Sequence, residues 1–307
     1  MSERFFKGYW MVTNRCNLDC GYCVLEDAPH QLRRELDGAG RQALVTHLHE
    51  RLGFRRLTLS GGEVTILGRR APDEFVDLLR HLRTLRSPDP RRHLEVEVYT
   101  NGALLDDRVA DEMAGVVDLV AVTIDSVRDE VLDQIGRNRG RHRRYLDRAA
   151  EVCGRLGHRG IPIKLHSVVG TLNHATLADE VGPILDRVQA AGANVAKWKF
   201  YQYMSYNDPA RDGFHAIDGD AYARTAEGVA RALDGSGVAL HFKDNAEMNA
   251  SLFNILSYGN AQFMRPGDTW TTTGRTRDLR TYGSMTELFA EHGLDEAAFR
   301  RFHEVVR

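Results

Sequence analysis

The chain has 307 residues, 42% of them hydrophobic, and its 41 basic and 43 acidic side chains leave a formal charge of −2. This length and apolar content suffice for one large α/β domain or two small ones, and the small net charge excludes long-range attraction to nucleic acid or anionic lipid. No run approaches the roughly 18 uninterrupted apolar residues of a membrane span, and the start MSERFFKGYW lacks the apolar core of a signal peptide. We therefore expect a cytoplasmic protein with no membrane partner.

Apolar runs of strand length alternate with longer segments of helical period as far as about residue 200. Strand-then-helix units of this kind imply a parallel sheet with right-handed crossovers, either doubly wound or curved into a barrel. The predicted strands are 9–13, 56–60, 94–100, 119–125, 161–169 and 195–203, and the predicted helices are 36–52, 71–85, 106–116, 141–156 and 177–191.

The pattern changes from about residue 205 onward. There it predicts a helix over 218–233, short strands near 238–242 and 251–256, and two closing helices, 284–291 and 295–305. We therefore divide the chain into a barrel with an N-terminal cysteine loop, 1–204, and a C-terminal extension, 205–307, that packs on the barrel as part of the same domain.

Three of the four cysteines lie within ten residues, in NRCNLDCGYC (14–23). In a reducing compartment such clustering favours metal ligation over disulfide bonds. A structural zinc site needs a fourth ligand, and His30, the nearest candidate, lacks the usual paired partner. Spacings of three and two residues suit three corners of an iron–sulfur cube, leaving one iron open. The spacing therefore favours a cluster over zinc, with buried, unligated cysteines as a third alternative.

This cysteine motif, C-x3-C-x2-C at Cys16, Cys20 and Cys23, with Tyr22 before the last cysteine, resembles that of the radical S-adenosylmethionine (SAM) superfamily. The second strand ends in SGGE (60–63), which is similar to the superfamily's glycine-rich loop. Glycines there allow close approach of the backbone to a ligand. The resemblance implies an α/β fold with a partial (β/α)6 barrel. It also implies one [4Fe–4S] cluster held by the three cysteines, SAM bound at the open iron and by Gly61, Gly62 and Glu63, and an external electron donor of the flavodoxin or ferredoxin type.

Short polar side chains follow the third and fourth predicted strands. They are Asn101 in YTNG (99–102) and Asp125 and Ser126 in IDS (124–126). Turn chemistry explains such residues at isolated positions. At the carboxyl ends of barrel strands, we expect them to contact the ribose or carboxylate of SAM.

Over about residues 9–263 the chain resembles viperin and its prokaryotic relatives more narrowly. IGRNRG (135–140) is similar to the segment in which an arginine, here Arg137, reaches the SAM carboxylate. KLHSVV (164–169) and KWKFYQ (197–202) resemble two strands that help to gather the triphosphate of a nucleotide. The positions that match the triphosphate-binding residues are Arg56, Lys164, Lys197 and Lys199, and all four are basic.

Strand periodicity supports an anion site independently of the resemblance. Lys164 and His166 lie two residues apart on one predicted strand, and Lys197 and Lys199 lie two apart on the next. Cations inside a barrel are costly without anionic partners, so this arrangement favours a phosphate-bearing ligand. If the strand parity is reversed, these side chains instead face the outside of the barrel.

Three residues depart from the viperin pattern, and the last two of them leave the reaction open. Val64 follows Glu63 where the family has proline, His166 replaces an asparagine near the nucleotide sugar, and Ser251 stands where a tyrosine is expected. The leading hypothesis is abstraction of a ribose hydrogen from a nucleoside triphosphate, followed by dehydration to a 3′-deoxy-3′,4′-didehydro product. The alternative is epimerisation, rearrangement or oxidation of another nucleotide, nucleoside or sugar. In either case His166 and Ser251 are candidate catalytic residues.

Other functions are less well supported by the sequence. Cys153, the only spare thiol, lies on the apolar face of a predicted helix, where we expect it to pack rather than react. The C-terminal extension lacks the cysteines that peptide-maturing relatives use for auxiliary clusters. A non-enzymatic nucleic-acid-binding protein is suggested only by RNRGRHRRYLDR (137–148), which we expect to be a solvated helix face, so no nucleic-acid partner is expected. The oligomeric state stays open.

Overall fold

The computed structural model describes residues 3–23, 35–138, 144–205, 209–265, 268 and 272–306. Seven parallel strands lie side by side in chain order, and all six strands predicted before residue 205 are present. The parallel strands are β1 (Arg4–Thr13), β2 (Phe54–Gly61), β3 (Glu95–Thr100), β4 (Leu119–Thr123), β5 (Ile163–Val169), β6 (Val195–Gln202) and β7 (Ala239–Lys243).

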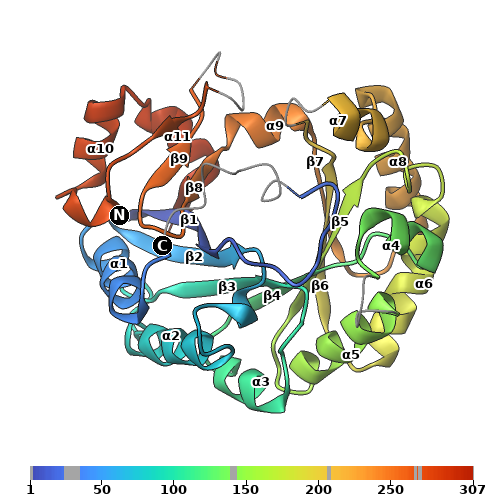
Figure 1. Cartoon of the computed structure of the whole chain (residues 1–307), viewed down its shortest axis with the longest axis horizontal. Coiled ribbons are helices and arrows are strands. Elements are labelled where there is room, and N and C mark those ends of the chain that lie inside the picture. Colours follow the sequence, from blue (N-terminus) through green and yellow to red (C-terminus); the bar gives the residue numbers. More distant parts are fainter. Residues whose placement is uncertain are drawn as a thin grey trace.

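Helices cover the outer face of this sheet (Figure 1). Three of the crossover helices follow aspartates whose side chains accept a backbone N–H of the first turn: Asp37 from Gly40 at 2.8 Å, Asp106 from Val109 at 2.9 Å and Asp218 from Ala221 at 2.6 Å. The crossover helices are α1 (Gly38–Glu50), α2 (Asp73–Thr84), α3 (Asp107–Met113), α4 (Asp129–Ile135), α5 (Tyr145–Gly157), α6 (Leu177–Ala190) and α8 (Gly219–Ala232). Two short 3-10 helices are η2 (Val64–Ile66) and η5 (Leu279–Thr281).

The segment after residue 204 extends the sheet at both ends. β7 continues it beyond β6, and β8 (Phe253–Ile255) runs parallel to β1 on the side away from β2. β9 (Ala261–Phe263) and β10 (Gly274–Arg275) follow antiparallel, and β11 (Glu304–Val306) pairs antiparallel with the start of β1. The remaining helices are α7 (Pro209–His215), α9 (Asn245–Ala250), α10 (Met285–His292) and α11 (Glu296–His303).

The sheet curves into a barrel that is not closed. No hydrogen-bonded pairing joins β7 to β8 among the described strands, and α9 connects the two across this opening (Figure 1). We call the opening between β7 and β8, with α9 across it, the seam. The predicted α/β fold with a partial barrel is confirmed.

Strand parity places the lysines on the inner face of the barrel. In the register of β5 with β6, Lys164 pairs with Lys197 and His166 with Lys199. The alternating residues, such as Trp198 and Phe200, are fully buried on the outer face under the helices, where their rings stack at 5.2 Å. The alternative of reversed parity is therefore wrong.

Two further predictions concern helices. Cys153 is fully buried within α5, in agreement with its predicted packing position. None of the helices in the described part of the chain is long and apolar enough to span a membrane.

Candidate active site

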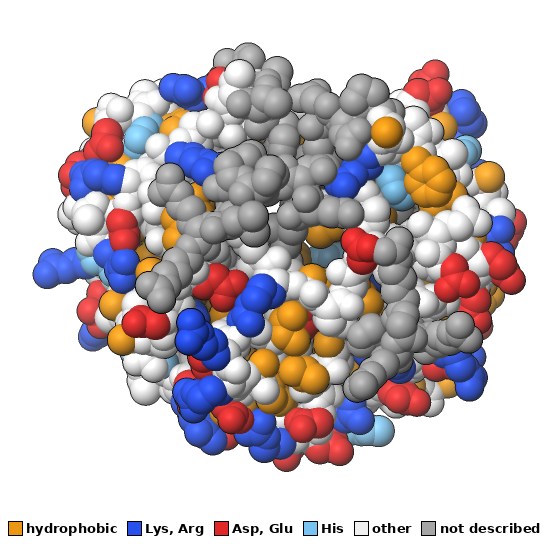
Figure 2. All heavy atoms as spheres, in the orientation of Figure 1, with side chains coloured by type: hydrophobic (Ala, Val, Ile, Leu, Met, Phe, Trp, Pro, Cys, Tyr) orange, Lys and Arg blue, Asp and Glu red, His pale blue; other side chains and the backbone are white. Residues whose placement is uncertain are grey.

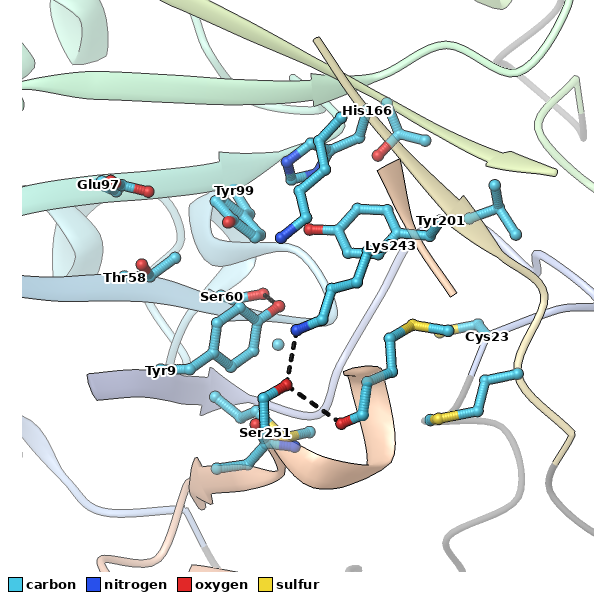
Figure 3. A pocket seen from close by; sticks show the side chains of 18 of the residues that line it. Tyr9, Cys23, Thr58, Ser60, Glu97, Tyr99, His166, Tyr201, Lys243 and Ser251 are labelled. Carbon is cyan, nitrogen blue, oxygen red and sulfur yellow. Dashed lines mark hydrogen bonds between the residues drawn. The ribbon is translucent and has the colours of Figure 1, made fainter. Parts of the chain in front are cut away.

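A cavity of about 750 Å³ runs from the carboxyl ends of the strands into the barrel. This size is in the range of sites that enclose a small organic ligand. Side chains from β3, β5, β6 and β7 point into the same space, and α9 closes its lower side in the close view (Figure 3). Among the described lining residues, seven side chains are lysine or arginine and two are glutamate: Lys7, Arg56, Arg137, Lys164, Lys199, Lys243 and Arg301, with Glu97 and Glu247.

The cysteine loop follows β1 at the mouth of this cavity. Cys16 is exposed, Cys20 and Cys23 are half-buried, and all three line the cavity. The backbone N–H of Cys23 donates to the Cys20 carbonyl at 2.8 Å, which forms a tight turn between these two cysteines. His30, the candidate fourth zinc ligand, lies outside the described residues.

The SGGE loop packs directly against the cysteine loop. The Gly62 N–H donates to the Thr13 carbonyl at 2.9 Å, and the Glu63 N–H donates to the Arg15 carbonyl at 2.8 Å. A Cβ atom at Gly62 would overlap the Arg15 carbonyl oxygen, so only glycine permits this approach. Gly61 and Gly62 both line the cavity; the nearest backbone to Gly61 is Thr13 at the end of β1, and the nearest to Gly62 is Arg15 of the cysteine loop.

Glu63 is fully buried and is not among the residues that line the cavity. Its carboxylate accepts hydrogen bonds from Thr65, from the Thr100 hydroxyl at 2.7 Å and from the Asn101 N–H at 2.6 Å. Glu63 therefore joins the ends of β2 and β3. Asn101 itself lines the cavity, and its amide donates to Asn17 of the cysteine loop at 3.0 Å and to the Cys16 sulfur at 3.7 Å.

A buried network joins the cysteine loop to β4 and to the end of α4. The Tyr22 hydroxyl donates to Asp125 at 2.6 Å, and Arg137 pairs with the same carboxylate at 2.9 Å and bonds Tyr22. The other Asp125 oxygen accepts the Val168 N–H at 2.9 Å. Tyr22 and Arg137 line the cavity, whereas Asp125 is fully buried behind them. Asp125 therefore orients these two side chains.

Ser126 lies outside the cavity, contrary to our expectation for a cofactor contact. Its hydroxyl donates to Glu180 of α6 at 2.5 Å, and the same carboxylate accepts the Val127 N–H and the Arg128 guanidinium. Since the chain turns toward α6 directly after Asp125, Ser126 faces this helix. It belongs to the connection between β4 and α4.

Three of the four predicted substrate-binding cations, Arg56, Lys164 and Lys199, line the cavity. Lys197 is exposed and is not among the lining residues, because it lies near the amino end of β6, two residues before Lys199. The structure therefore does not bring Lys197 together with the others, and we leave it out of the proposed site.

Two acidic residues of β3, which the sequence analysis missed, pair with cations of β2 and β5. Glu95 pairs with Arg56 at 2.5 Å, and Glu97 pairs with Lys164 at 3.3 Å. Lys164 also donates to the Tyr99 hydroxyl at 2.9 Å. The alternation in LEVEVYT places Glu95, Glu97 and Tyr99 on one face of the strand. The strand period therefore contained the information needed to identify these side chains.

His166 lies between two tyrosine rings on the inner face (Figure 3). The ring centroids of Tyr99 and Tyr201 are 4.6 and 5.2 Å from the imidazole, both edge-on. Burial, reinforced by the charges of Lys164 and Lys199, lowers the pKa of His166 well below its ordinary value. Its Nε2 atom is buried with no hydrogen-bond partner among the described residues. His166 is thus a neutral imidazole with an unused hydrogen-bonding atom.

Ser251 ends α9 and lines the cavity at the seam (Figure 3). Its hydroxyl accepts from Lys243 at 2.6 Å and donates to the Met248 carbonyl at 3.2 Å. Sequence analysis did not identify Lys243 or Lys7, because Lys243 falls one residue after the predicted strand and Lys7 two residues before the first one.

Comparison with known proteins identifies the family. The model of the radical SAM superfamily matches residues 10–179, which include the cysteine loop and the first five strands. The chain belongs to the radical SAM superfamily. Radical SAM enzymes bind a [4Fe–4S] cluster and SAM, and these are the cofactors of this enzyme. The hypothesis of a non-enzymatic nucleic-acid-binding protein is therefore wrong.

Three radical SAM relatives illustrate the range of substrates. A GTP 3′,8-cyclase of Microcystis aeruginosa is 30% identical over 55% of this chain and 49% of its own length. An S-adenosylmethionine-dependent nucleotide dehydratase of a Thermoplasmatales archaeon is 24% identical over 78% of this chain and 76% of its own. A PqqA peptide cyclase of Xanthomonas oryzae is 28% identical over 73% and 57%. The chain spans about half the length of the GTP 3′,8-cyclases that it matches.

Solved radical SAM structures share the fold. Streptococcus suis SuiB bound to S-adenosylmethionine superimposes with a TM-score of 0.65 over 97% of this chain and 67% of its own, at 13% identity. The enzyme anSMEcpe with bound AdoMet and a peptide gives a TM-score of 0.66 over 95% and 83%, at 14% identity. These similarities show that the barrel and its extension follow a radical SAM architecture.

The cysteine loop fits a cluster better than a single metal ion. The three thiols line one cavity, yet in the part of the chain that the structure describes no three His, Cys, Asp or Glu side chains converge on one ion position. A cubic cluster uses each thiolate on a different iron, so separated thiols suit it. Cys16, Cys20 and Cys23 are the residues that would hold it, and the neighbouring Asn101, Tyr22 and Arg137 offer polar groups for SAM.

Proposed function

We propose that this radical SAM enzyme removes a ribose hydrogen atom from a nucleoside triphosphate and dehydrates it to a 3′-deoxy-3′,4′-didehydro nucleotide. The observation that carries the proposal is the single cavity in which the cysteine loop opens onto a cation-rich barrel interior. Such an interior favours a multiply charged anion as ligand. The nucleotide-acting relatives, a cyclase of GTP and a nucleotide dehydratase, support the substrate class.

The residues divide the work along the cavity. Cys16, Cys20 and Cys23 would hold the cluster, and Gly61, Gly62, Asn101 and Arg137, which line the same cavity, would bind SAM. When bound, these cofactors supply the radical that abstracts the hydrogen atom. The cluster would require an external one-electron donor, which we expect to be of the flavodoxin or ferredoxin class.

The deeper half of the cavity positions the nucleotide. The neutral imidazole of His166 can bond a sugar hydroxyl or a base edge, because its Nε2 atom has no partner among the described residues. Tyr99 and Tyr201 hold the imidazole on both sides and exclude water from it. Lys199, whose charge acts on this histidine, attracts the phosphates.

The test is an anaerobic assay of the cluster-loaded enzyme with SAM, a reductant and each common ribonucleoside triphosphate. We expect one of them to stimulate 5′-deoxyadenosine formation and to yield a product that has lost one water. A substrate deuterated at C4′ should transfer its deuterium to 5′-deoxyadenosine. Stimulation by none of the triphosphates would refute the proposal.

A cysteine pair provides the matched control. Cys16→Ala removes a proposed cluster ligand and should abolish both bound iron and SAM cleavage. Cys153→Ala removes the thiol that is fully buried in α5, so it should retain both. Equal loss of iron in the two variants would contradict the ligand assignment.

The second candidate is a redox-neutral transformation of a nucleotide or sugar, such as epimerisation. It is favoured by the tyrosines Tyr9, Tyr99 and Tyr201, which line the cavity where Cys153 cannot reach. A phenol O–H can return a hydrogen atom to a substrate radical, after which the external donor and a solvent proton restore the tyrosine. In D2O this reaction places deuterium on a carbon of the product, whereas dehydration yields a product lacking one water.

A further inference from the structure

The chain contains very few lysines, and most of them line one cavity. Of its 41 basic residues other than histidine, only five are lysines: Lys7, Lys164, Lys197, Lys199 and Lys243. All but Lys197 line the cavity. Arginine supplies all the others among these 41. Lysine differs in its compact charge, its three rotatable donors and its ability to lose the proton on burial. Lysine is therefore concentrated in the cavity, where it accounts for four of the seven basic side chains among the described lining residues.

The cavity lysines fall into two groups with different partners. On β5, Lys164 is engaged by Glu97 and Tyr99, and on β2 Arg56 is engaged by Glu95. Three others, Lys7 on β1, Lys199 on β6 and Lys243 on β7, come from strands at and next to the seam. We call these three the seam lysines.

The seam lysines are less completely paired with carboxylates than Lys164 and Arg56 are. In the described part of the chain, Lys7 and Lys199 form no ion pair, and Lys243 has only Glu247 at 3.9 Å, besides its hydrogen bond to Ser251 (Figure 3). Their like charges act on one another: burial, followed by the charges of Lys243 and Lys164, lowers the pKa of Lys199 to about 7. Burial also lowers the pKa of Lys243 and of Lys7. Such a cluster is stabilised by an anion.

We propose that Lys7, Lys199 and Lys243 bind a phosphate group of the substrate at the seam, and that Arg56 and Lys164 do not form the phosphate site. The carboxylates that act on the three ammonium groups are Glu247, 3.9 Å from Lys243, and Glu97, which already pairs with Lys164. Three ammonium groups with these partners match a multiply charged phosphate better than a single carboxylate ligand. The identity of the ligand as a nucleotide rests on the proposed function, but the anion site itself is testable with inorganic tripolyphosphate.

Binding at this site takes up protons. The groups that face Lys199 are Lys7 on β1, Lys164 and His166 on β5, His241 and Lys243 on β7, and Glu247 on α9. Without ligand, Lys199 is largely neutral at pH 8 because its pKa is lowered to about 7. A bound anion favours the ammonium form, so the affinity decreases as the pH rises above 7.

The experiment is anaerobic calorimetric titration of the cluster- and SAM-loaded protein with tripolyphosphate at pH 7. We expect Lys7→Met, Lys199→Met and Lys243→Met each to weaken binding roughly tenfold or more. Lys197→Met removes the exposed lysine two residues from Lys199 and should leave the affinity unchanged. Lys164→Met should likewise have little effect. The visible absorbance of the cluster and the thermal midpoint show that each variant is folded.

A second measurement detects the proton directly. Titrations at pH 8 in HEPES and in Tris, whose ionisation enthalpies differ, should report proton uptake that is larger for the wild type than for Lys199→Met.

Absence of tripolyphosphate binding, or weakening by Lys164→Met but not by the seam variants, would overturn the proposal. If tripolyphosphate binds at the seam lysines while no nucleotide is turned over, the proposed function fails and this site stands. If a nucleotide is turned over and the seam variants leave its KM unchanged, the proposed function stands and the phosphate site at the seam fails.

Discussion

At the scale of single residues, His166 lowers the stability of the free protein but keeps a hydrogen-bonding atom available to a ligand. Its imidazole is neutral, enclosed by Tyr99 and Tyr201, and its buried Nε2 atom has no partner in the described structure. A buried polar atom without a hydrogen bond is unfavourable in the free protein. A substrate can bond the same atom at no further desolvation cost. The missing hydrogen bond in the free protein is therefore what leaves His166 able to bind a ligand.

We expect His166→Phe to raise the stability of the ligand-free protein by about 1 kcal/mol, because an apolar ring replaces an unsatisfied polar group. The same change should abolish substrate-stimulated SAM cleavage. Thermal midpoints and 5′-deoxyadenosine formation, measured on the same preparations, test the two effects. His166→Asn keeps a hydrogen-bonding group and serves as the control that retains part of the activity. A loss of stability in His166→Phe larger than in His166→Asn would contradict this interpretation.

At the scale of elements, the glycine loop after β2 and the cysteine loop after β1 form one unit. Their backbones are joined by hydrogen bonds from Gly62 and Glu63, and Glu63 extends the connection to β3. Gly136 makes a similar close approach from the end of α4, where a Cβ atom would overlap the Asp19 carbonyl. Three connections at the carboxyl ends of the strands thus shape the loop that carries the cysteines.

The prediction at this scale is that Gly62→Ala forces the two loops apart. Overpacking of this kind costs about 1–3 kcal/mol, and we expect it to reduce the iron and sulfide bound per chain. Gly182→Ala in α6 is the matched control, since a Cβ atom there meets nothing within 4 Å. It should bind iron normally and gain up to about 1 kcal/mol of helix stability. Normal iron content in Gly62→Ala would show that the contact is dispensable.

At the scale of the whole molecule, charge is distributed unevenly between surface and interior. The net charge is −2, and basic and acidic side chains are intermixed on the face shown in Figure 2. The cavity, in contrast, is rich in cations and in histidines that must stay neutral. Among these histidines, burial lowers the pKa of His303 to about 4 and the pKa of His166 to well below its ordinary range.

These histidines predict a loss of stability on mild acidification. As the pH falls below about 6.5, the unfolded chain binds protons that the folded protein does not, so stability present above 6.5 is lost toward pH 4. Each histidine contributes about 1.4 kcal/mol per pH unit in this window. Thermal midpoints of the cluster-loaded protein at pH 7 and 5.5 should show the decrease. His303→Gln, which keeps a donor for the Ser251 carbonyl, should reduce it; an identical pH dependence would refute the assignment.

The sequence by itself determined the features that depend on local chain properties. The strand and helix alternation, the spacing of Cys16, Cys20 and Cys23 and the glycines of SGGE are visible in short stretches, because backbone geometry and ligand spacing act over a few residues. Strand period likewise predicted that Lys164 and His166 share one face of their strand and that Lys197 and Lys199 share one face of the next. The family therefore follows from the sequence, and the fold follows from the family and the periodicity.

Only the tertiary structure decided which of these side chains are free to bind a ligand. Register places Glu95 beside Arg56, and Glu97 reaches Lys164 across β4, so cations that the sequence assigned to a phosphate already have partners. Lys197 is exposed near the amino end of β6. Because the barrel is incomplete, Lys7 and Lys243 lie on strands at and next to the seam. Charge pairing acts across strands that are far apart in the chain, and therefore no local pattern contains it.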